Sequence, residues 1–215
     1  MHKHSRSDVM SSKAYSPKQR LEIRDKLLQV GLKRYAKEGI QAVRLVDIVQ
    51  EVGISKPFFY KFFSSVQDFV IEVIDYQWGY LSHILSVIEE DKQMIWQDKV
   101  RILLDKLIHH RNHGILIMTQ DEEMWVRDKV SDEIYTDFMH RQISFFNHLL
   151  DLWDIPDGAC DPRVLANLML SIIVTYNSGK ETFPFFYLDV LEETAKTQSE
   201  CLITYLESIK THSIN

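Results

Sequence analysis

Apolar residues recur at helical spacing along most of this chain. The first such run lies between Ser16-Pro17, where a helix is expected to begin, and Gly39, where it is expected to end. Proline is tolerated in the first turn of a helix, and glycine after the last turn is a common stop. The apolar residues of this run keep the three-to-four spacing of one helix face; they are Leu21, Leu27, Leu28, Leu32 and Tyr35.

Two short helical segments follow, separated by a glycine. The first has an apolar face that ends at Gly53, made of Leu45, Ile48, Val49 and Val52. The second covers residues 56–62, with Ser55 as the expected N-cap and Pro57 in the first turn, since serine is a preferred N-cap residue.

A long helix is predicted from Ser65, where Ser65 and Asp68 have the spacing of a capping box, to about Glu90. The rest of the chain predicts further helices over residues 95–113, 121–129, 131–153, 162–180 and 187–210. No alternation typical of strands competes with these patterns. The sequence therefore predicts an all-α fold.

Composition agrees with helices and narrows the class of protein. Seven glycines and five prolines in 215 residues leave little material for hairpins, Rossmann turns or phosphate loops. Two cysteines, Cys160 and Cys201, exclude a disulfide scaffold and a four-cysteine zinc site, and they fit a reducing cytosol. The most apolar stretch, residues 168–174, is too short to span a bilayer. We expect a cytoplasmic protein that does not enter the membrane.

Charge is divided unevenly along the chain. Residues 1–63 contain 13 Lys and Arg against 6 Asp and Glu, a net charge of +7, whereas residues 64–215 contain 12 against 25, a net charge of −13. A cationic N-terminal quarter on an anionic body is what a phosphate-binding head would show.

The segment 45–63, LVDIVQEVGISKPFFYKFF, has the pattern of a helix-turn-helix. Gly53 supplies the turn conformation that a Cβ would resist. A small core is expected from Ile48, Val52, Ile54, Phe59 and Phe63. The second helix then presents Lys56, Pro57, Phe58, Tyr60 and Lys61 outward, where its N-terminal half can enter a major groove.

Residues 20–70 resemble the N-terminal domain of the TetR (tetracycline-repressor) family of transcriptional regulators. The matching residues are Leu27-Leu28, Tyr35, Glu38-Gly39, Asp47-Ile48, Val52-Gly53-Ile54-Ser55-Lys56, Tyr60, Phe63, Ser65 and Asp68-Phe69. Residues 1–15 are polar and lack periodicity, so a flexible basic tail is expected there. The resemblance implies a three-helix DNA-binding domain over 16–64 and a larger helical effector-binding and dimerisation domain over 65–215. No cofactor is expected.

The resemblance also implies which residues contact DNA. They are Arg44, Ser55, Lys56, Pro57, Phe58, Tyr60 and Lys61. Arg44 stands where family members commonly carry a capping threonine, and Val66 replaces a usual lysine. We therefore expect the second helix to start without a side-chain cap, and Arg44 to restore the lost cation.

Aromatic residues and methionines between the long helix and the last two helices suggest an apolar effector pocket. The candidate lining residues are Trp78, Leu81, Met118, Trp125, Phe138, Met139, Phe146 and Tyr176. A packed core uses the same residue types, so the sequence leaves both interpretations open.

The last two helices carry apolar stripes that, by the resemblance, would pair across a two-fold axis. The candidate interface residues are Leu165, Leu168, Met169, Ile172, Leu191, Ala195, Leu202 and Tyr205. Burial within the single chain is the alternative.

Together these features predict a ligand-responsive regulator, a repressor acting as a homodimer on a palindromic DNA operator, with a partly apolar small molecule as effector. The alternative is a helical-bundle metal-dependent enzyme that uses His109 with His113, at helical i, i+4 spacing, and Asp137 with His140. The sequence carries no nucleophile motif or phosphate loop for an enzyme.

Overall fold

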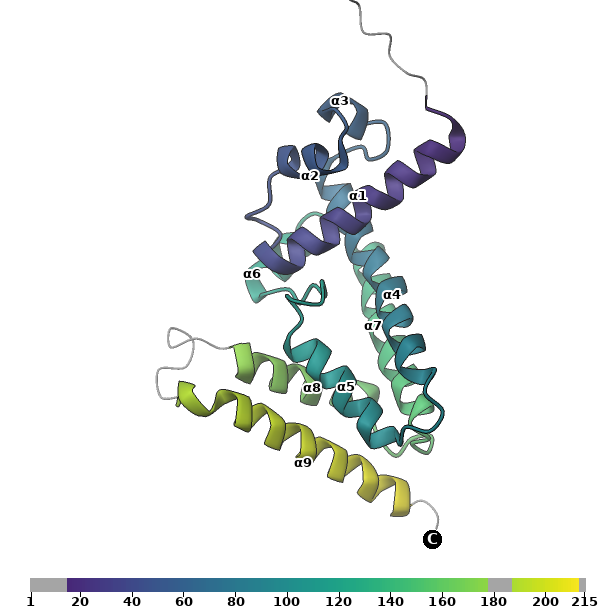
Figure 1. The fold of residues 1–215 in the computed structure, drawn as a ribbon, viewed down its shortest axis with the longest axis vertical. Helices are drawn as coiled ribbons and strands as arrows, with labels where there is room; N and C mark the ends of the chain where they lie inside the picture. The colour runs from purple at the N-terminus through teal and green to yellow at the C-terminus, as the bar shows by residue number, and fades with distance from the viewer. Residues whose placement is uncertain (1–14, 178–186, 213–215) are drawn as a thin grey trace, which may run out of the picture.

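The computed structural model describes residues 15–177 and 187–212, and these residues form helices joined by short turns, with no strand among them (Figure 1). The predicted all-α class is confirmed. In chain order the helices are α1 (Pro17–Glu38), α2 (Leu45–Val52), α3 (Lys56–Phe59), α4 (Val66–Glu89), α5 (Trp96–Ile108), α6 (Gln120–Arg127), α7 (Asp132–Leu152), α8 (Pro162–Asn177), the 3₁₀ turn η1 (Leu188–Val190) and α9 (Leu191–His212). The predicted tail, except Tyr15, lies outside the described residues.

Helices α1, α3, α4, α6 and α7 each begin after a serine or threonine whose side chain caps the helix. Ser16 caps α1 in a reciprocal capping box with Gln19, so two backbone donors of the first turn are paired. Ser65 caps α4 by accepting a hydrogen bond from the Asp68 backbone N–H at 3.0 Å. The reciprocal half of the expected box is replaced, because the Asp68 carboxylate accepts the Ser64 hydroxyl instead.

Two hydrophobic cores are arranged along the length of the molecule. The head core lies among α1, α2, α3 and the first half of α4, and the body core lies among the second half of α4 and helices α5, α7, α8 and α9. Helix α4 is common to both cores: Phe69 and Val73 are fully buried in the head core, while Leu81 and Leu85 are buried in the body core. Figure 1 shows α4 extending from the head into the body.

No helix within residues 15–177 and 187–212 is long and apolar enough to cross a membrane.

Helix α1 packs closely against α4 at Gly31. A Cβ placed there would lie 2.6 Å from the Phe69 ring and 2.9 Å from a Val73 methyl group. Both neighbours are fully buried and packed, so they have no room to give way. The absence of a side chain at Gly31 is therefore what lets the two helices cross at this distance.

We expect Gly31→Ala to lower the free energy of unfolding by about 1–3 kcal/mol, because overpacking forces buried neighbours out of their rotamers. Gly79→Ala is the matched control, since Gly79 lies within α4 and a Cβ placed there would meet nothing within 4 Å. The control should raise stability by about 0.5–1 kcal/mol, the usual gain of alanine over glycine in a helix. Equal effects in chemical denaturation would contradict the close approach.

Candidate nucleic-acid interface and ligand cavity

Helices α2 and α3 form the predicted helix-turn-helix at the end of the head (Figure 1). Gly53 ends α2 in the left-handed conformation, with φ 83° and ψ 33°, which residues with a Cβ adopt at a cost. The N–H groups of Gly53 and Ile54 both donate to the Val49 carbonyl at 3.0 Å. The turn therefore closes as the sequence predicted.

The second helix of the motif is shorter than the predicted residues 56–62. Helix α3 ends at Phe59, and residues 60–62 continue as hydrogen-bonded turns. Ser55 is the N-cap, as predicted, and its hydroxyl accepts from the Phe58 N–H at 3.4 Å. The Phe62 N–H donates to the Phe59 carbonyl at 2.9 Å, so the segment keeps a helical course beyond α3.

The inner side of this segment is an aromatic cluster. Phe59 is completely buried and Phe63 is 2% exposed. Their rings contact each other at a centroid distance of 5.1 Å and contact Phe69 of α4 at 5.2 Å and 4.8 Å. Most of the predicted small core is thus present, with Ile54 half-buried beside it.

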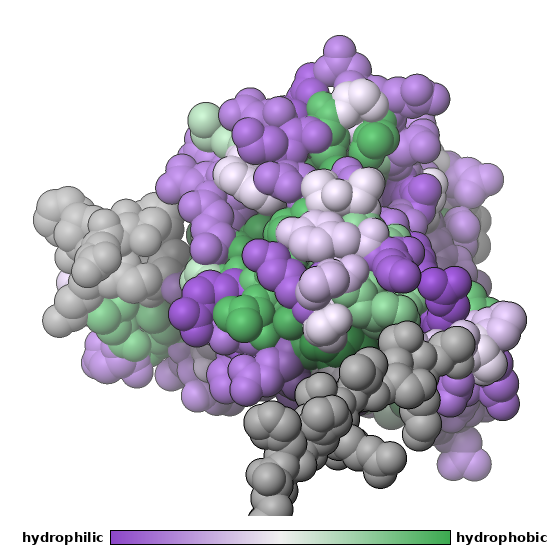
Figure 2. Space-filling view, turned by 90° about the horizontal axis from the view of Figure 1, so that it is seen from above, coloured by the Kyte–Doolittle hydropathy of each residue, from purple (hydrophilic) through white to green (hydrophobic). Residues whose placement is uncertain are grey.

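The outer side carries the predicted contact residues Lys56, Pro57, Tyr60 and Lys61, all exposed. Figure 2 views the molecule from above, over the end where α2 and α3 lie, and shows a largely hydrophilic face with apolar side chains visible between polar ones. A surface with cations and exposed rings can contact both phosphates and sugars.

Phe58 differs from its predicted placement. It is half-buried rather than fully outward, because Tyr15 lies against its ring at 4.8 Å and Phe62 at 5.2 Å. Tyr15 precedes the first helix in the sequence, so no local pattern indicated this contact.

Three cations of the head lie on or beside α3. Lys56, Lys61 and Arg20 form no ion pair within the part of the chain that the structure describes. Arg20 and Lys61 line a common groove between the start of α1 and the end of the α3 segment. Sequence reasoning missed Arg20 because it lies outside the helix-turn-helix, although the sequence did place it near the start of the first helix.

Arg44 stands at the N-cap of α2 and makes no side-chain cap, as expected. Its guanidinium instead forms two hydrogen bonds of 3.0 Å with the Asp47 carboxylate. These bonds raise the pKa of Arg44 and lower the pKa of Asp47. Since the Asp47 charge offsets that of Arg44, this side chain adds less positive charge to the surface than Lys56 or Lys61.

The head is joined to the body through the start of α6. Glu122, 7% exposed, accepts a hydrogen bond of 2.6 Å from the Ile40 backbone N–H in the α1–α2 loop. Its second oxygen accepts from the Thr119 N–H at 2.9 Å, which caps α6. A second contact between distant residues lies within the head, where Arg24 of α1 forms an ion pair with Glu72 in the first half of α4. Sequence reasoning missed both contacts because their partners are distant in the chain.

A cavity of about 470 Å³ lies among α4, the segment before α6, α7 and α8. We call it the central cavity. Five of the eight predicted pocket residues line it, namely Trp78, Met118, Phe138, Met139 and Phe146. Its volume is within the usual range of ligand sites, roughly 300–1,000 Å³.

Three predicted pocket residues do not line this cavity. Leu81 is packed inside the body core and Trp125 packs against the head core. Tyr176 packs against the body core, and its hydroxyl lies 3.0 Å from His109 Nε2. The packed-core interpretation therefore holds for these three.

Most of the predicted dimer residues are buried inside the single chain. Their exposed fractions are 0–4%, so they are not available to contact a second chain. These residues are Leu165, Met169, Ile172, Ala195 and Leu202. This part of the prediction was wrong because the stripes of α8 and α9 pack on each other and on the body core. Leu168 and Tyr205 are each 37% exposed, and Leu191 is half-buried.

The histidines do not form the geometry of the alternative metal site. Helix α5 ends at Ile108, so His109 and His113 lie in turns rather than on one helix face. His109 lies 3.0 Å from the Asp105 carbonyl and 3.0 Å from Tyr176 through its two ring nitrogens. Across residues 15–177 and 187–212, no three His, Cys, Asp or Glu side chains, Asp137 and His140 included, are grouped to hold a metal ion.

Comparison with known proteins shows the same fold in transcriptional regulators. A TetR-family regulator from Cytophaga hutchinsonii is 12% identical, with a TM-score of 0.60 over 92% of this chain and 98% of that one. Two TetR-family regulators from Streptomyces coelicolor are each 15% identical: one has a TM-score of 0.57 over 87% of this chain and 98% of its own, and the other 0.55 over 88% and 97%. The chain therefore has the fold of TetR-family regulators.

Similarity in sequence is weaker. No protein-family profile matches the chain. The uncharacterized HTH-type transcriptional regulator YerO of Bacillus subtilis is 23% identical over 105 residues, which are 46% of this chain and 36% of that protein. The match thus spans about a third of the length of that relative.

The aromatic cluster of the head leads to a stability prediction. Phe59→Ala should lower the free energy of unfolding by about 3–5 kcal/mol, the usual cost of truncating a buried phenylalanine. Phe58→Ala should cost about 1 kcal/mol, because only part of that ring is covered. Thermal melting of both variants compares them directly. Similar losses would mean that Phe58 belongs to the core and faces no ligand.

Proposed function

We propose that this protein is a DNA-binding transcriptional regulator of the TetR family. The observation that carries the proposal is the helix-turn-helix whose outer side holds Lys56, Lys61 and the neighbouring Arg20 without carboxylate partners among the described residues. The fold shared with TetR-family regulators supports it. Acting on DNA, the protein would work in the cytoplasm.

On DNA, the cations would supply affinity and the α3 segment would supply sequence preference. Phosphate neutralisation by Lys and Arg releases counterions and makes binding depend on salt. Ser55 and Pro57 bring the start of α3 toward the groove, and Tyr60 can donate to a phosphate. Phe58 offers an apolar edge, which suits the methyl group of thymine.

We further propose that the protein acts as a homodimer through the exposed sides of α8 and α9. These sides carry uncharged residues, namely Val164, Leu168 and Val174 of α8 with Thr197, Cys201 and Tyr205 of α9. The helices are neighbours, since Gln198 of α9 donates to Thr175 of α8 at 3.4 Å. Two heads could then reach successive major grooves of a palindromic operator, about 34–36 Å apart.

The central cavity is the proposed effector site, and repression the proposed mode. A ligand that favours one head orientation by about 1–3 kcal/mol would change DNA affinity roughly 5–150-fold. Helix α4 is packed in both cores, and α6 contacts the head through Glu122, so these two helices are the expected transmitters. No observation favours the metal-dependent enzyme, because the described residues bring no metal-ligating group together.

The proposal predicts that Lys61→Ala lowers the salt dependence of duplex binding by about one unit for each bound chain, because each phosphate contact releases about one counterion. Lys129→Ala is the matched control, since Lys129 is an exposed lysine of the body. Binding isotherms on a duplex at several salt concentrations provide the slope. If both variants keep the wild-type slope, Lys61 faces solvent and the proposed DNA surface is elsewhere.

The dimer proposal predicts that Leu168→Glu releases monomers in sedimentation, since a charge in an apolar interface lacks a partner. Val87→Glu, which replaces an equally apolar residue 50% exposed on α4, should leave the dimer intact. Leu202→Glu should instead unfold the chain, because Leu202 is buried within it. If the Leu168→Glu variant remains a dimer, the interface lies on another face of the protein.

A further inference from the structure

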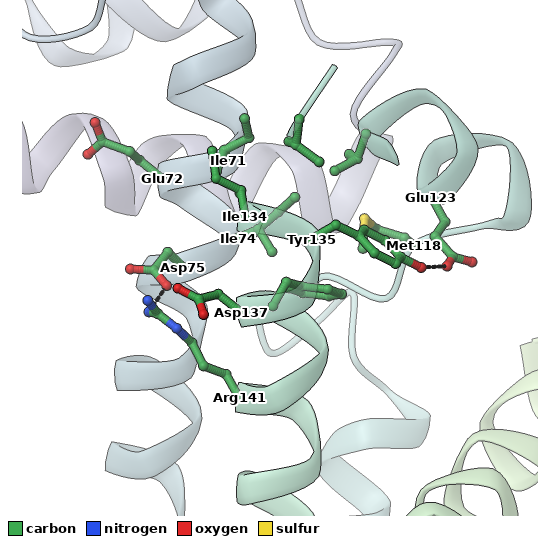
Figure 3. Close-up of a pocket in the computed structure, with 13 residues that line it drawn as sticks. Ile71, Glu72, Ile74, Asp75, Met118, Glu123, Ile134, Tyr135, Asp137 and Arg141 are labelled. Atoms are coloured by element: carbon green, nitrogen blue, oxygen red, sulfur yellow. Dashed lines mark hydrogen bonds and ion pairs between the residues drawn. The ribbon is translucent and has the colours of Figure 1, made fainter. Parts of the chain in front are cut away.

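A second cavity, of about 240 Å³, lies among α4, α6 and α7 at the junction of head and body (Figure 3). We call it the rim cavity. Apolar side chains make up most of its wall, namely Ile71, Ile74, Met118, Val126, Val130, Ile134 and Phe138. Ile74, Met118 and Phe138 also line the central cavity, so the two cavities share a wall.

The ionisable groups around the rim cavity are predominantly acidic. Four carboxylates and one guanidinium line it, namely Glu72, Asp75, Glu123, Asp137 and Arg141. The Arg141 guanidinium is engaged by Asp75, as Figure 3 shows. Glu72 is engaged by Arg24 of α1. These pairs leave the charges of Glu123 and Asp137 without a cation to offset them.

The two remaining carboxylates lie on opposite sides of the apolar wall. Glu123 accepts a hydrogen bond of 2.8 Å from the Tyr135 hydroxyl. Asp137 lies beside the Asp75–Arg141 pair (Figure 3) and forms no hydrogen bond or ion pair within residues 15–177 and 187–212. Arg127, whose guanidinium lies 4.7 Å from the Tyr135 ring centre, is itself paired with Asp132.

We propose that the rim cavity binds a small organic cation whose apolar body contacts Ile71, Val130 and Phe138 and whose positive charge faces Asp137. Asp137 and Glu123 are exposed, so water screens their attraction for the cation, and the apolar wall contributes by removing the apolar body of the ligand from water. The Tyr135 and Phe138 rings add a favourable electrostatic surface for a cation. An anion would meet two unbalanced carboxylates and would have to displace Asp75 from Arg141.

The position of the rim cavity connects this ligand class with regulation. Its wall includes Glu72, which pairs with Arg24 of the head. Its wall also includes residues of α6, the helix whose start holds the Ile40 N–H through Glu122. A bound cation would therefore lie next to the Arg24–Glu72 pair of the head and next to α6, which contacts the head through Glu122. Naming this cation as the effector rests on the proposed function, whereas binding itself does not.

Calorimetry on the purified full chain, without DNA, tests the binding. The probes are benzyltrimethylammonium and, as an anion of similar size, 3-phenylpropionate. We expect the cation to bind at least about tenfold more tightly than the anion, a difference of about 1.4 kcal/mol. Asp137→Asn should weaken cation binding by about tenfold, since it removes one negative charge and no contact within the described residues.

Glu133→Gln is the matched control, because Glu133 lies one turn earlier on α7, is exposed, and does not line the cavity. It should change the cation affinity by less than about twofold, because water and salt screen an exposed charge that lies outside the cavity. Glu123→Gln keeps an acceptor for Tyr135 and provides a second charge removal, expected to weaken the cation by a similar factor to Asp137→Asn. Melting temperatures confirm that each variant folds.

Equal affinity for the two probes, or equal effects of Asp137→Asn and Glu133→Gln, would overturn the cation site. Retention of the full chain on a DNA duplex at low salt is measured in parallel. Loss of retention with intact cation binding would refute the regulator and leave the cavity assignment standing. Retention on the duplex without cation binding would refute the cation site and leave the proposed regulator standing.

Discussion

Helix α4 is packed in two cores at once, and the rest of the molecule depends on this sharing. Its first half carries Phe69 and Val73 into the head, and its second half carries Leu81 and Leu85 into the body. Each fully buried side chain of this size is worth roughly 1.5–3 kcal/mol, so neither half detaches readily. Because Gly31 lets α1 pack closely against α4, a change in the direction of α4 would move α1 and the head with it.

The charges of the chain are distributed in the same two-part manner. The N-terminal 63 residues hold a net charge of +7 and the remainder −13. In the head, Lys56 and Lys61 point away from the core, whereas Arg24 and Arg34 are paired with Glu72 and Glu51. Lys56 and Lys61 are thus left without a carboxylate partner among the described residues, while the pairs of Arg24 and Arg34 join elements of the head.

The local features of this fold could be predicted from sequence, and its distant contacts could not. Ser16, Gly53 and Ser55 act within their own segment, so their roles were readable. The contact of Glu122 with Ile40 spans 82 positions and has no local signal. Periodicity located the apolar stripe of α9, but it could not tell whether Leu202 faces its own chain or another, because both give the same spacing.

The contact between Glu122 and Ile40 would set the free-energy scale of a signal that passes from a ligand in the proposed effector site through α6 to the head. Both carboxylate oxygens of Glu122 are used, one by Ile40 and one by Thr119. A shift of α6 that breaks the bond to Ile40 leaves a buried N–H unpaired, which costs about 1–3 kcal/mol. That cost is as large as a typical allosteric coupling, about 1–3 kcal/mol. A ligand that binds equally well before and after the shift of α6 could not offset this cost. A ligand would act on the head through α6 only if its contacts depend on where α6 lies, and both the rim cavity and the central cavity include Glu123 of α6 in their walls.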